Sequence, residues 1–214
     1  MKNHAYPIMP EGFLFFIPFA LLACLFAVLS WYVAATLSGL LAVFVIWFFR
    51  NPERNIPDED KGIASPADGR ILKIEEGKGM DGFPEGFTKV SIFMSLFNVH
   101  VNRVPCSGQV KKISYREGKF FAANLDKAST ENESNAVTIT TDDSGEIRVV
   151  QIAGLVARRI VCWLEEGMRV TRGERFGMIR FGSRLEVFAP RGTRIIVSPG
   201  DKVKAGATVI GFLQ

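Results

Sequence analysis

Residues 12–49 read GFLFFIPFALLACLFAVLSWYVAATLSGLLAVFVIWFF, and none of these side chains is charged. A helix needs about 20 apolar residues to cross roughly 30 Å of hydrocarbon. The run is nearly twice that length, so it predicts a helical hairpin over about residues 13–29 and 32–49. Trp31 and Tyr32 would then lie near the far membrane interface. One span followed by an interfacial or partly buried helix is the alternative.

The run differs from a cleaved signal peptide, which has a short apolar core and a small-residue cleavage site. It ends instead in Phe48-Phe49-Arg50-Asn51-Pro52. Both ends of a hairpin lie on one side of the membrane, and Lys2, Arg50 and Arg54 place that side in the cytoplasm by the positive-inside rule. We therefore expect residues 1–50 to anchor the chain in the cell membrane, with the rest on the cytoplasmic side.

After this run, residues 51–61 are a polar, proline-punctuated linker, and residues 62–214 read as short strands with glycine turns. Two patterns recur: Gly167-x-x-Val170-x-x-Gly173 as Gly200-x-x-Val203-x-x-Gly206, and Pro66-x-x-Gly69-x-Ile71-x-x-Ile74 as Pro105-x-x-Gly108-x-Val110-x-x-Ile113. Such turns are typical of the lipoyl or biotinyl barrel-sandwich. The predicted fold class is mainly β, a barrel-sandwich-like domain of short strands behind an N-terminal hydrophobic helical hairpin.

The composition narrows the chemistry. A net charge of +4 and a pI of about 9.0 suit nucleic acid or an anionic membrane surface equally well. The cysteines, Cys24, Cys106 and Cys162, are odd in number and lack metal-type spacing, which fits a reducing compartment without a disulfide framework. Histidine occurs only at His4 and His100, so imidazole chemistry in the domain depends on His100.

The segment Phe181-Gly182-Ser183-Arg184 contains a glycine–serine pair, which is also a common turn. Glycine permits a strained backbone, and the serine hydroxyl could attack the carbonyl before it to form an ester. Elimination of that ester and hydrolysis of the resulting dehydroalanine would leave a pyruvoyl group at a new N-terminus. Its carbonyl can form a Schiff base with a substrate amine and act as an electron sink.

Two further residues could serve that chemistry. His100 lies in a strand-like run before a proline turn, where it is either structural or a base for Ser183 and a later proton donor. Asp68 precedes Gly69, which predicts a hairpin turn. Alternatively, its carboxylate orients His100, as in a Ser-His-Asp arrangement.

Taken in order, these motifs resemble the phosphatidylserine decarboxylase family, and most closely its short, bacterial and archaeal-type subgroup. The motifs are Ser65-Pro66-Ala67-Asp68-Gly69, Phe97-Asn98-Val99-His100-Val101-Asn102-Arg103-Val104-Pro105, Asn132-Glu133-Ser134-Asn135 and Phe181-Gly182-Ser183, after the apolar exit Phe48-Phe49-Arg50-Asn51-Pro52. The resemblance covers nearly the whole chain. Each motif is weak alone, whereas the ordered set is specific.

The resemblance implies a role for each matching residue. Ser183 matches the self-cleaving serine that becomes the pyruvoyl group, and Gly182 matches the new C-terminus of the larger fragment. His100 matches the first histidine of the family's histidine motif, and Asp68 the acid of an Asp-His-Ser triad.

The resemblance also implies the reaction. Phosphatidylserine would be decarboxylated to phosphatidylethanolamine in phospholipid biosynthesis, with no metal, pyridoxal phosphate or nucleic acid. Fragments 1–182 and 183–214 would form a heterodimer at the membrane. The basic surplus agrees with an anionic lipid substrate. An archaetidylserine would suit the same headgroup chemistry.

Two motifs depart from the family pattern: the cleavage site is Phe181-Gly182-Ser183-Arg184 where many members have Leu-Gly-Ser-Thr, and Arg103 stands where many have a second histidine. Arg103 could hold a carboxylate or phosphate instead. The rival interpretation is a membrane-tethered barrel-sandwich adaptor without enzymatic activity. Such adaptors usually carry long coiled-coil hairpins, and the sequence has no heptad run.

Overall fold

The computed structural model describes residues 4–142, 145–155, 159–180 and 183–214 of the chain. It divides into two compact units, Met1–Glu53 and Arg54–Gln214. The division falls within the stretch 51–61 that the sequence predicts as a linker.

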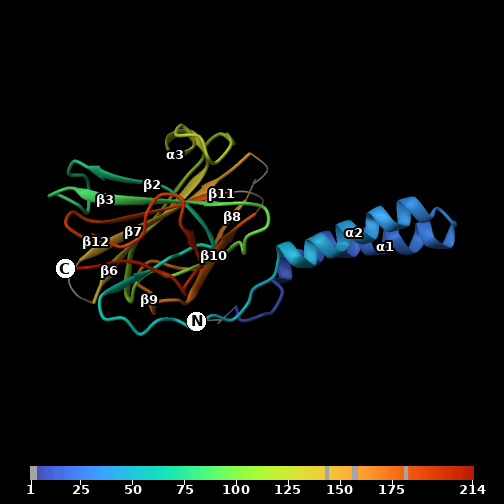
Figure 1. Cartoon of the computed structure of the whole chain (residues 1–214), viewed down its shortest axis with the longest axis horizontal. Coiled ribbons are helices and arrows are strands. Elements are labelled where there is room, and N and C mark those ends of the chain that lie inside the picture. The colour runs from blue at the N-terminus through green and yellow to red at the C-terminus, as the bar shows by residue number, and fades with distance from the viewer. Residues whose placement is uncertain (1–3, 143–144, 156–158, 181–182) are drawn as a thin grey trace. The chain divides into compact units, whose positions relative to one another are not determined.

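The first unit is a pair of apolar helices joined by a short turn (Figure 1). Its elements are η1 (Pro10–Gly12), α1 (Phe13–Val28) and α2 (Tyr32–Phe48). None of the α1 residues, all of which are described, is buried, so α1 presents apolar side chains on all sides, as a helix in lipid does. The segment Pro10–Val28 is long and apolar enough to cross a membrane, whereas Tyr32–Phe48 is apolar but shorter. The two helices occupy nearly the ranges expected for the hairpin.

The second unit is mainly β, which confirms the predicted fold class. Within the described residues, its largest sheet has eight antiparallel strands in the order β13-β2-β3-β11-β7-β6-β5-β9. These strands are β2 (Gly69–Gly77), β3 (Phe87–Met94), β5 (Gly108–Arg116), β6 (Ser134–Thr141), β7 (Glu146–Ala153), β9 (Arg169–Val170), β11 (Ser183–Pro190) and β13 (Lys202–Val203).

In the described part of this unit, two smaller sheets and a short helix accompany the large sheet. The sheets have the orders β1-β14-β12 and β4-β10-β8. Their strands are β1 (Gly62–Ala64), β4 (Val101–Arg103), β8 (Ile160–Cys162), β10 (Arg175–Ile179), β12 (Arg194–Ile195) and β14 (Val209–Phe212), and the helix is α3 (Ala128–Glu131).

The hydrophobic core lies against one face of the large sheet. Side chains along a strand alternate between faces, so Ser183, Leu185 and Val187 share the core face of β11, and Arg184 and Glu186 the other. The core cluster has mostly branched aliphatic members from several strands, among them Ile71, Val90, Ile92, Val110, Val137, Ile139, Val149, Leu185 and Val187. The alternation therefore places the predicted nucleophile on the face that carries the hydrophobic core.

The large sheet consists of two similar halves. Half A comprises β13, β2, β3 and β11, and half B comprises β9, β5, β6 and β7. The recurring proline–glycine pattern leads into β2 in half A and β5 in half B. Each of these strands has a register shift at the same place, between Ile71 and Lys73 and between Val110 and Lys112. The repeated sequence therefore marks a repeated structure.

The edge strands of the two halves are attached in the same way. In half A, Gly200 N donates to Ile71 O at 2.8 Å, and in half B, Gly167 N donates to Val110 O at 2.8 Å. These glycines begin the two recurring glycine patterns, which frame β13 and β9.

The outer edges of the two halves meet in a seam, which curls the sheet. The glycines that end the two patterns, Gly173 and Gly206, have φ of 82° and 73°, a region that favours glycine. A Cβ on Gly206 would lie 3.5 Å from Gly173 Cα and 2.7 Å from Arg103 Cδ. Arg103 Nη1 donates to Gly173 O at 2.7 Å. The arginine that stands in place of a second histidine therefore lies in this seam.

Candidate active site

Ser183 is the first residue of β11, at the centre of the large sheet where the halves join. It pairs with Met94 at the end of β3 and with Ala153 at the end of β7. Its side chain is fully buried, and Oγ donates to Met94 Sδ at 3.3 Å. A thioether is a weak acceptor, so the hydroxyl loses little on leaving it. Gly182, the other predicted cleavage residue, lies outside the described residues, as does Phe181.

Arg184 follows Ser183 in β11, and its side chain lies on the opposite face of the sheet. Its side chain is only 2% exposed, and Nη2 lies 2.9 Å from Glu186 Oε1 and 2.9 Å from Ser91 Oγ. Ser129 Oγ donates to the same Glu186 oxygen at 2.7 Å. Buried charges need such partners, because desolvation is costly. Hydrogen bonds of this buried ion pair with Ser91 and Ser129 therefore hold the strand immediately after the predicted cleavage site.

His100 is buried just before β4, and the backbone carbonyl of Asn98 holds its ring. Nδ1 lies 2.9 Å from the carbonyl oxygen of Asn98, which can only accept a hydrogen bond. A neutral imidazole there carries its proton on Nδ1 and its lone pair on Nε2. The carbonyl of His100 accepts from Ile179 N at 3.3 Å. His100 thus lies beside β10, the strand from which the chain continues to Ser183.

Asp68 lies in the turn before β2 and is 8% exposed. Its Oδ2 accepts from Arg54 Nη2 at 2.9 Å, and its Oδ1 accepts from Ala205 N at 2.8 Å. In the described part of the chain, Asp68 forms its hydrogen bonds with these groups rather than with His100, whose Nδ1 faces the Asn98 carbonyl. The triad role of Asp68 stays a prediction.

A chain of buried amides leads to the sulfur that receives the Ser183 hydroxyl. Asn135 Nδ2 donates to Gln151 Oε1 at 3.1 Å, and Gln151 Nε2 donates to Asn102 Oδ1 at 2.9 Å. Asn102 Nδ2 in turn lies 3.8 Å from Met94 Sδ. Each amide is fixed by its neighbour. Asn102 and Asn135 lie in the motifs noted from the sequence, whereas Gln151 gives no signal because it stands in an ordinary strand pattern.

Asn132, from another of those motifs, fixes the end of β7. Its Oδ1 accepts from Phe121 N at 2.9 Å, and its Nδ2 donates to Phe121 O at 2.8 Å and to Ala153 O at 2.7 Å. Ala153 is the β7 partner of Ser183. The motif therefore supports the backbone beside the predicted nucleophile.

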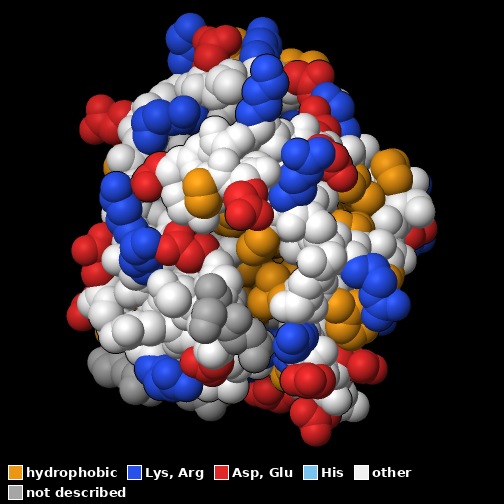
Figure 2. Space-filling view, turned by 90° about the vertical axis from the view of Figure 1, so that its left-hand side faces the viewer, with side chains coloured by type: hydrophobic (Ala, Val, Ile, Leu, Met, Phe, Trp, Pro, Cys, Tyr) orange, Lys and Arg blue, Asp and Glu red, His pale blue; other side chains and the backbone are white. Residues whose placement is uncertain are grey.

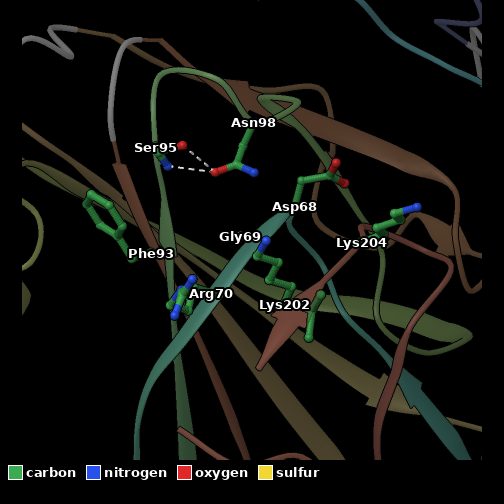
Figure 3. A pocket seen from close by; sticks show the side chains of 9 residues that line it. Asp68, Gly69, Arg70, Phe93, Ser95, Asn98, Lys202 and Lys204 are labelled. Atoms are coloured by element: carbon green, nitrogen blue, oxygen red, sulfur yellow. Dashed lines mark hydrogen bonds between the residues drawn. The ribbon is translucent and has the colours of Figure 1, made fainter. Parts of the chain in front are cut away.

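A cavity of about 580 Å³ opens beside β2 and β13 in half A. It is lined by Asp68, Gly69, Arg70, Phe93, Ser95, Asn98, Lys202, Val203 and Lys204. Figure 3 shows Asp68 and Asn98 on one side of it and Arg70 and Lys202 on the other, with two hydrogen bonds from Ser95 to Asn98. Asp68 and Asn98, whose carbonyl contacts the His100 ring, thus line the same cavity.

The described residues offer acid–base and nucleophilic groups rather than a metal site. Among them, no three His, Cys, Asp or Glu side chains gather as a set that could hold a metal ion. Cys162 is close to the buried amides, and burial raises the pKa of its thiol while a hydrogen bond with Asn135 acts in the opposite direction. Ser183 and His100 remain the candidates for covalent and proton-transfer chemistry.

Comparison with known proteins identifies relatives over nearly the whole chain. The family model described as phosphatidylserine decarboxylase matches residues 41–211. The phosphatidylserine decarboxylase proenzyme of Syntrophus aciditrophicus (strain SB) is 54% identical over 214 residues, covering 99% of each chain. The proenzyme of the same name from Geobacter sp. (strain M21) is 46% identical over 220 residues, covering 100% of each chain. That of Saccharopolyspora erythraea is 45% identical and covers 97% of this chain and 89% of its own length.

Proposed function

The chain belongs to the phosphatidylserine decarboxylase family, and from this premise we propose that it cleaves itself between Gly182 and Ser183 and then decarboxylates phosphatidylserine to phosphatidylethanolamine. The observation that supports the proposal is the position of Ser183, which is buried, begins β11 and is held between β3 and β7. Membership of a decarboxylase family argues against the adaptor alternative.

Self-cleavage begins with attack of Ser183 Oγ on the carbonyl carbon of Gly182. His100 Nε2 takes the hydroxyl proton, and the peptide C–N bond breaks as the amine gains a proton, which leaves an ester. Loss of the Cα proton of residue 183 then breaks its Cβ–O bond and frees the Gly182 carboxylate. Water converts the resulting dehydroalanine to a pyruvoyl group and releases ammonia.

A pyruvoyl group at position 183 fits this site because the side chain there is buried and the strand is fixed on both sides. The group supplies the electron sink for loss of carbon dioxide. His100 then gives a proton to the substrate carbon that lost the carboxylate. The buried amides reach Met94 through Asn102 Nδ2, which lies 3.8 Å from the sulfur that accepts from Ser183.

The two fragments, 1–182 and 183–214, remain together as a heterodimer. Strand β11 of the smaller fragment lies between β3 and β7 of the larger one, so separation would break two ladders of backbone hydrogen bonds. Intact mass of the purified protein tests the cleavage. We expect two fragments that divide before residue 183, with the smaller blocked to Edman sequencing. One uncut and fully active chain would contradict the proposal.

The apolar helices are the proposed anchor in the cell membrane, with the second unit on the cytoplasmic side. Washing membranes in about 1 M salt, where the Debye length is about 3 Å, removes proteins held by charge alone. The full-length protein should stay in the membrane. Release by salt would show that attachment is electrostatic.

A further inference from the structure

We propose that the cavity in half A binds the phosphodiester of the substrate's headgroup. The inference rests on the proposed function, because it states where the phosphate of that lipid lies. Neither the family match nor the predicted triad assigns a phosphate site.

The lining of the cavity has a positive charge that the protein leaves unbalanced. Arg70, Lys202 and Lys204 line it, and within the described residues no hydrogen bond or ion pair engages their side chains. The acid in the lining, Asp68, is countered by Arg54 at 2.9 Å. An anion would therefore meet three cations and a neutralised carboxylate.

Basic residues elsewhere in the second unit often have acidic neighbours. Figure 2 shows one end of the molecule, where Lys and Arg side chains lie among Asp and Glu side chains. Paired cations of this unit include Lys73, Lys89, Lys111, Lys119, Arg148 and Arg169. Arg70, Lys202 and Lys204 differ from these residues because no acidic side chain pairs with them in the described part of the chain.

Half B shows that the fold does not require these cations. Lys202 pairs with Arg70 at the edge of half A, and the matching pair in half B is Arg169 with Gln109. Arg169 is neutralised there by Asp142 at 2.8 Å. The same edge therefore forms with one paired cation in half B and with two unpaired cations in half A.

A neutral donor also faces the cavity. Asn98 Oδ1 accepts from both the backbone N and the Oγ of Ser95 at 2.8 Å, so the amide NH₂ is turned away from Ser95 (Figure 3). Phosphate oxygens accept strong hydrogen bonds from amides and cations. The carbonyl of Asn98 also holds His100 Nδ1. One residue thus links the proposed phosphate site to the imidazole.

The strand register places the cavity close to the reacting residue. Arg70 pairs with Phe93, and Phe93 pairs with Arg184, next to Ser183. Neighbouring strands lie about 4.8 Å apart, so β2 is about 10 Å from β11. Met94, the partner of Ser183, is followed directly by the lining residue Ser95.

The surroundings favour a lipid over free phosphate. The turn that presents Ser95 and Asn98 exposes Leu96 (38%) and Phe97 (70%). Leu155, two residues beyond the end of β7, is 65% exposed. These apolar side chains lie at the strand ends around Ser183, where the acyl chains of a bound phospholipid could contact them.

Kinetics of the processed full-length protein test the site. In the Arg70→Gln/Lys202→Gln double variant, we expect complete self-cleavage, an unchanged kcat, and a KM for short-chain phosphatidylserine raised about 10- to 100-fold, the value of charged hydrogen bonds. Arg169→Gln, which removes the matching cation of half B, is the control and should leave KM unchanged. An unchanged KM in the double variant would overturn the proposal.

Binding to the uncleaved Ser183→Ala chain separates this inference from the proposed catalysis. Glycerophosphoserine should bind that chain more tightly than inorganic phosphate does, and the double variant should lose the binding. Equal affinity for the two probes would make the cavity a free-phosphate site and overturn the headgroup assignment. Failure of wild-type cleavage alone would contradict the proposed function and leave this binding result standing.

Discussion

The two halves of the large sheet share their strands, their bulges and their edge glycines, but they end differently. In half B, β6 leads directly into β7, and Gly145 N donates to Thr141 Oγ1 at 3.1 Å across the turn. In half A, the matching strands β3 and β11 are also neighbours, yet the chain between Met94 and Ser183 contains all of half B. The predicted site forms where half A lacks this hairpin, because the ends of two strands that are far apart in the sequence meet there.

A second difference lies at the turns that precede β2 and β5. Ser107 Oγ accepts from Arg172 N at 3.0 Å in half B, and Asp68 Oδ1 accepts from Ala205 N at 2.8 Å in half A. Both residues therefore cap an edge turn. Only Asp68 has a second oxygen, which pairs with Arg54. Capping the turn uses only Oδ1 of Asp68. A further function of Asp68 would therefore involve Oδ2 and its negative charge.

Ser183→Ala should have the largest effect, because it removes the hydroxyl from the open end of half A. We expect a single, inactive chain by intact mass. The control is Gly145→Ala at the closed end of half B, where a Cβ would make ordinary contacts with Thr141 and Pro190 at 3.5 and 3.8 Å. Normal processing of Ser183→Ala would falsify the assignment of the nucleophile.

His100→Ala should slow self-cleavage about 10²–10⁴-fold, the usual value of general acid–base catalysis. The rate is measured by following fragment formation after synthesis. His4→Asn is the control, because His4 is the other histidine of the chain and asparagine tolerates its φ of 36°. A loss well below tenfold would make His100 a bystander.

The variants Asp68→Asn and Ser107→Ala change the residues that cap the matching turns of half A and half B. Comparing them distinguishes the charge of Asp68 from its capping role. The asparagine keeps an oxygen for Ala205 N but loses the charge opposite Arg54, so we expect slower cleavage, with a smaller loss than in His100→Ala. Ser107→Ala should lower stability by about 0.5–1.5 kcal/mol, the value of a hydrogen bond, with normal cleavage. Urea unfolding and fragment formation measure the two effects. Equal cleavage rates in both variants would limit Asp68 to its capping role.

Glu75→Gln should have the smallest effect. Hydrogen bonds from Lys73 and then Lys89 lower the pKa of Glu75, whereas Ser114 occupies the matching position of half B. The pKa of Glu75 is lower in the folded protein than in the unfolded chain, where it is about 4.3. The ionised carboxylate therefore stabilises the fold above that pH, and this stabilisation disappears as the pH falls through the pKa of the folded state. The variant should lose at most about 1 kcal/mol at pH 7, and its Tm should approach that of the wild type near pH 3. If the difference in Tm between the variant and the wild type were the same from about pH 7 to about pH 3, the ion pairs of Glu75 with Lys73 and Lys89 would not be its cause.

The sequence alone predicts the helical pair, the mainly β fold and the repeated turns, because each depends on local patterns of charge, glycine and alternation. It also identifies Ser183 and His100 as candidates from residue type. It does not predict the contacts of Arg184 with Ser91, of Glu186 with Ser129, or of Gln151 with Asn102. Those contacts join strands far apart in the chain, and local periodicity contains no information about which strands become neighbours. The Asn98 carbonyl beside His100 is a backbone group, which no motif identifies.

The central position of β11 has a consequence for how the protein can refold. Before cleavage, folding involves one chain, and its rate is independent of concentration. After the proposed cleavage, recovery from the unfolded state would be a bimolecular reaction in which a short peptide must find the gap between β3 and β7. The larger fragment alone would expose two unpaired strand edges there, which favours association with other copies. The proposed cleavage would therefore make recovery of the fold depend on protein concentration, and the persistence of the cleaved protein would depend on how slowly it unfolds.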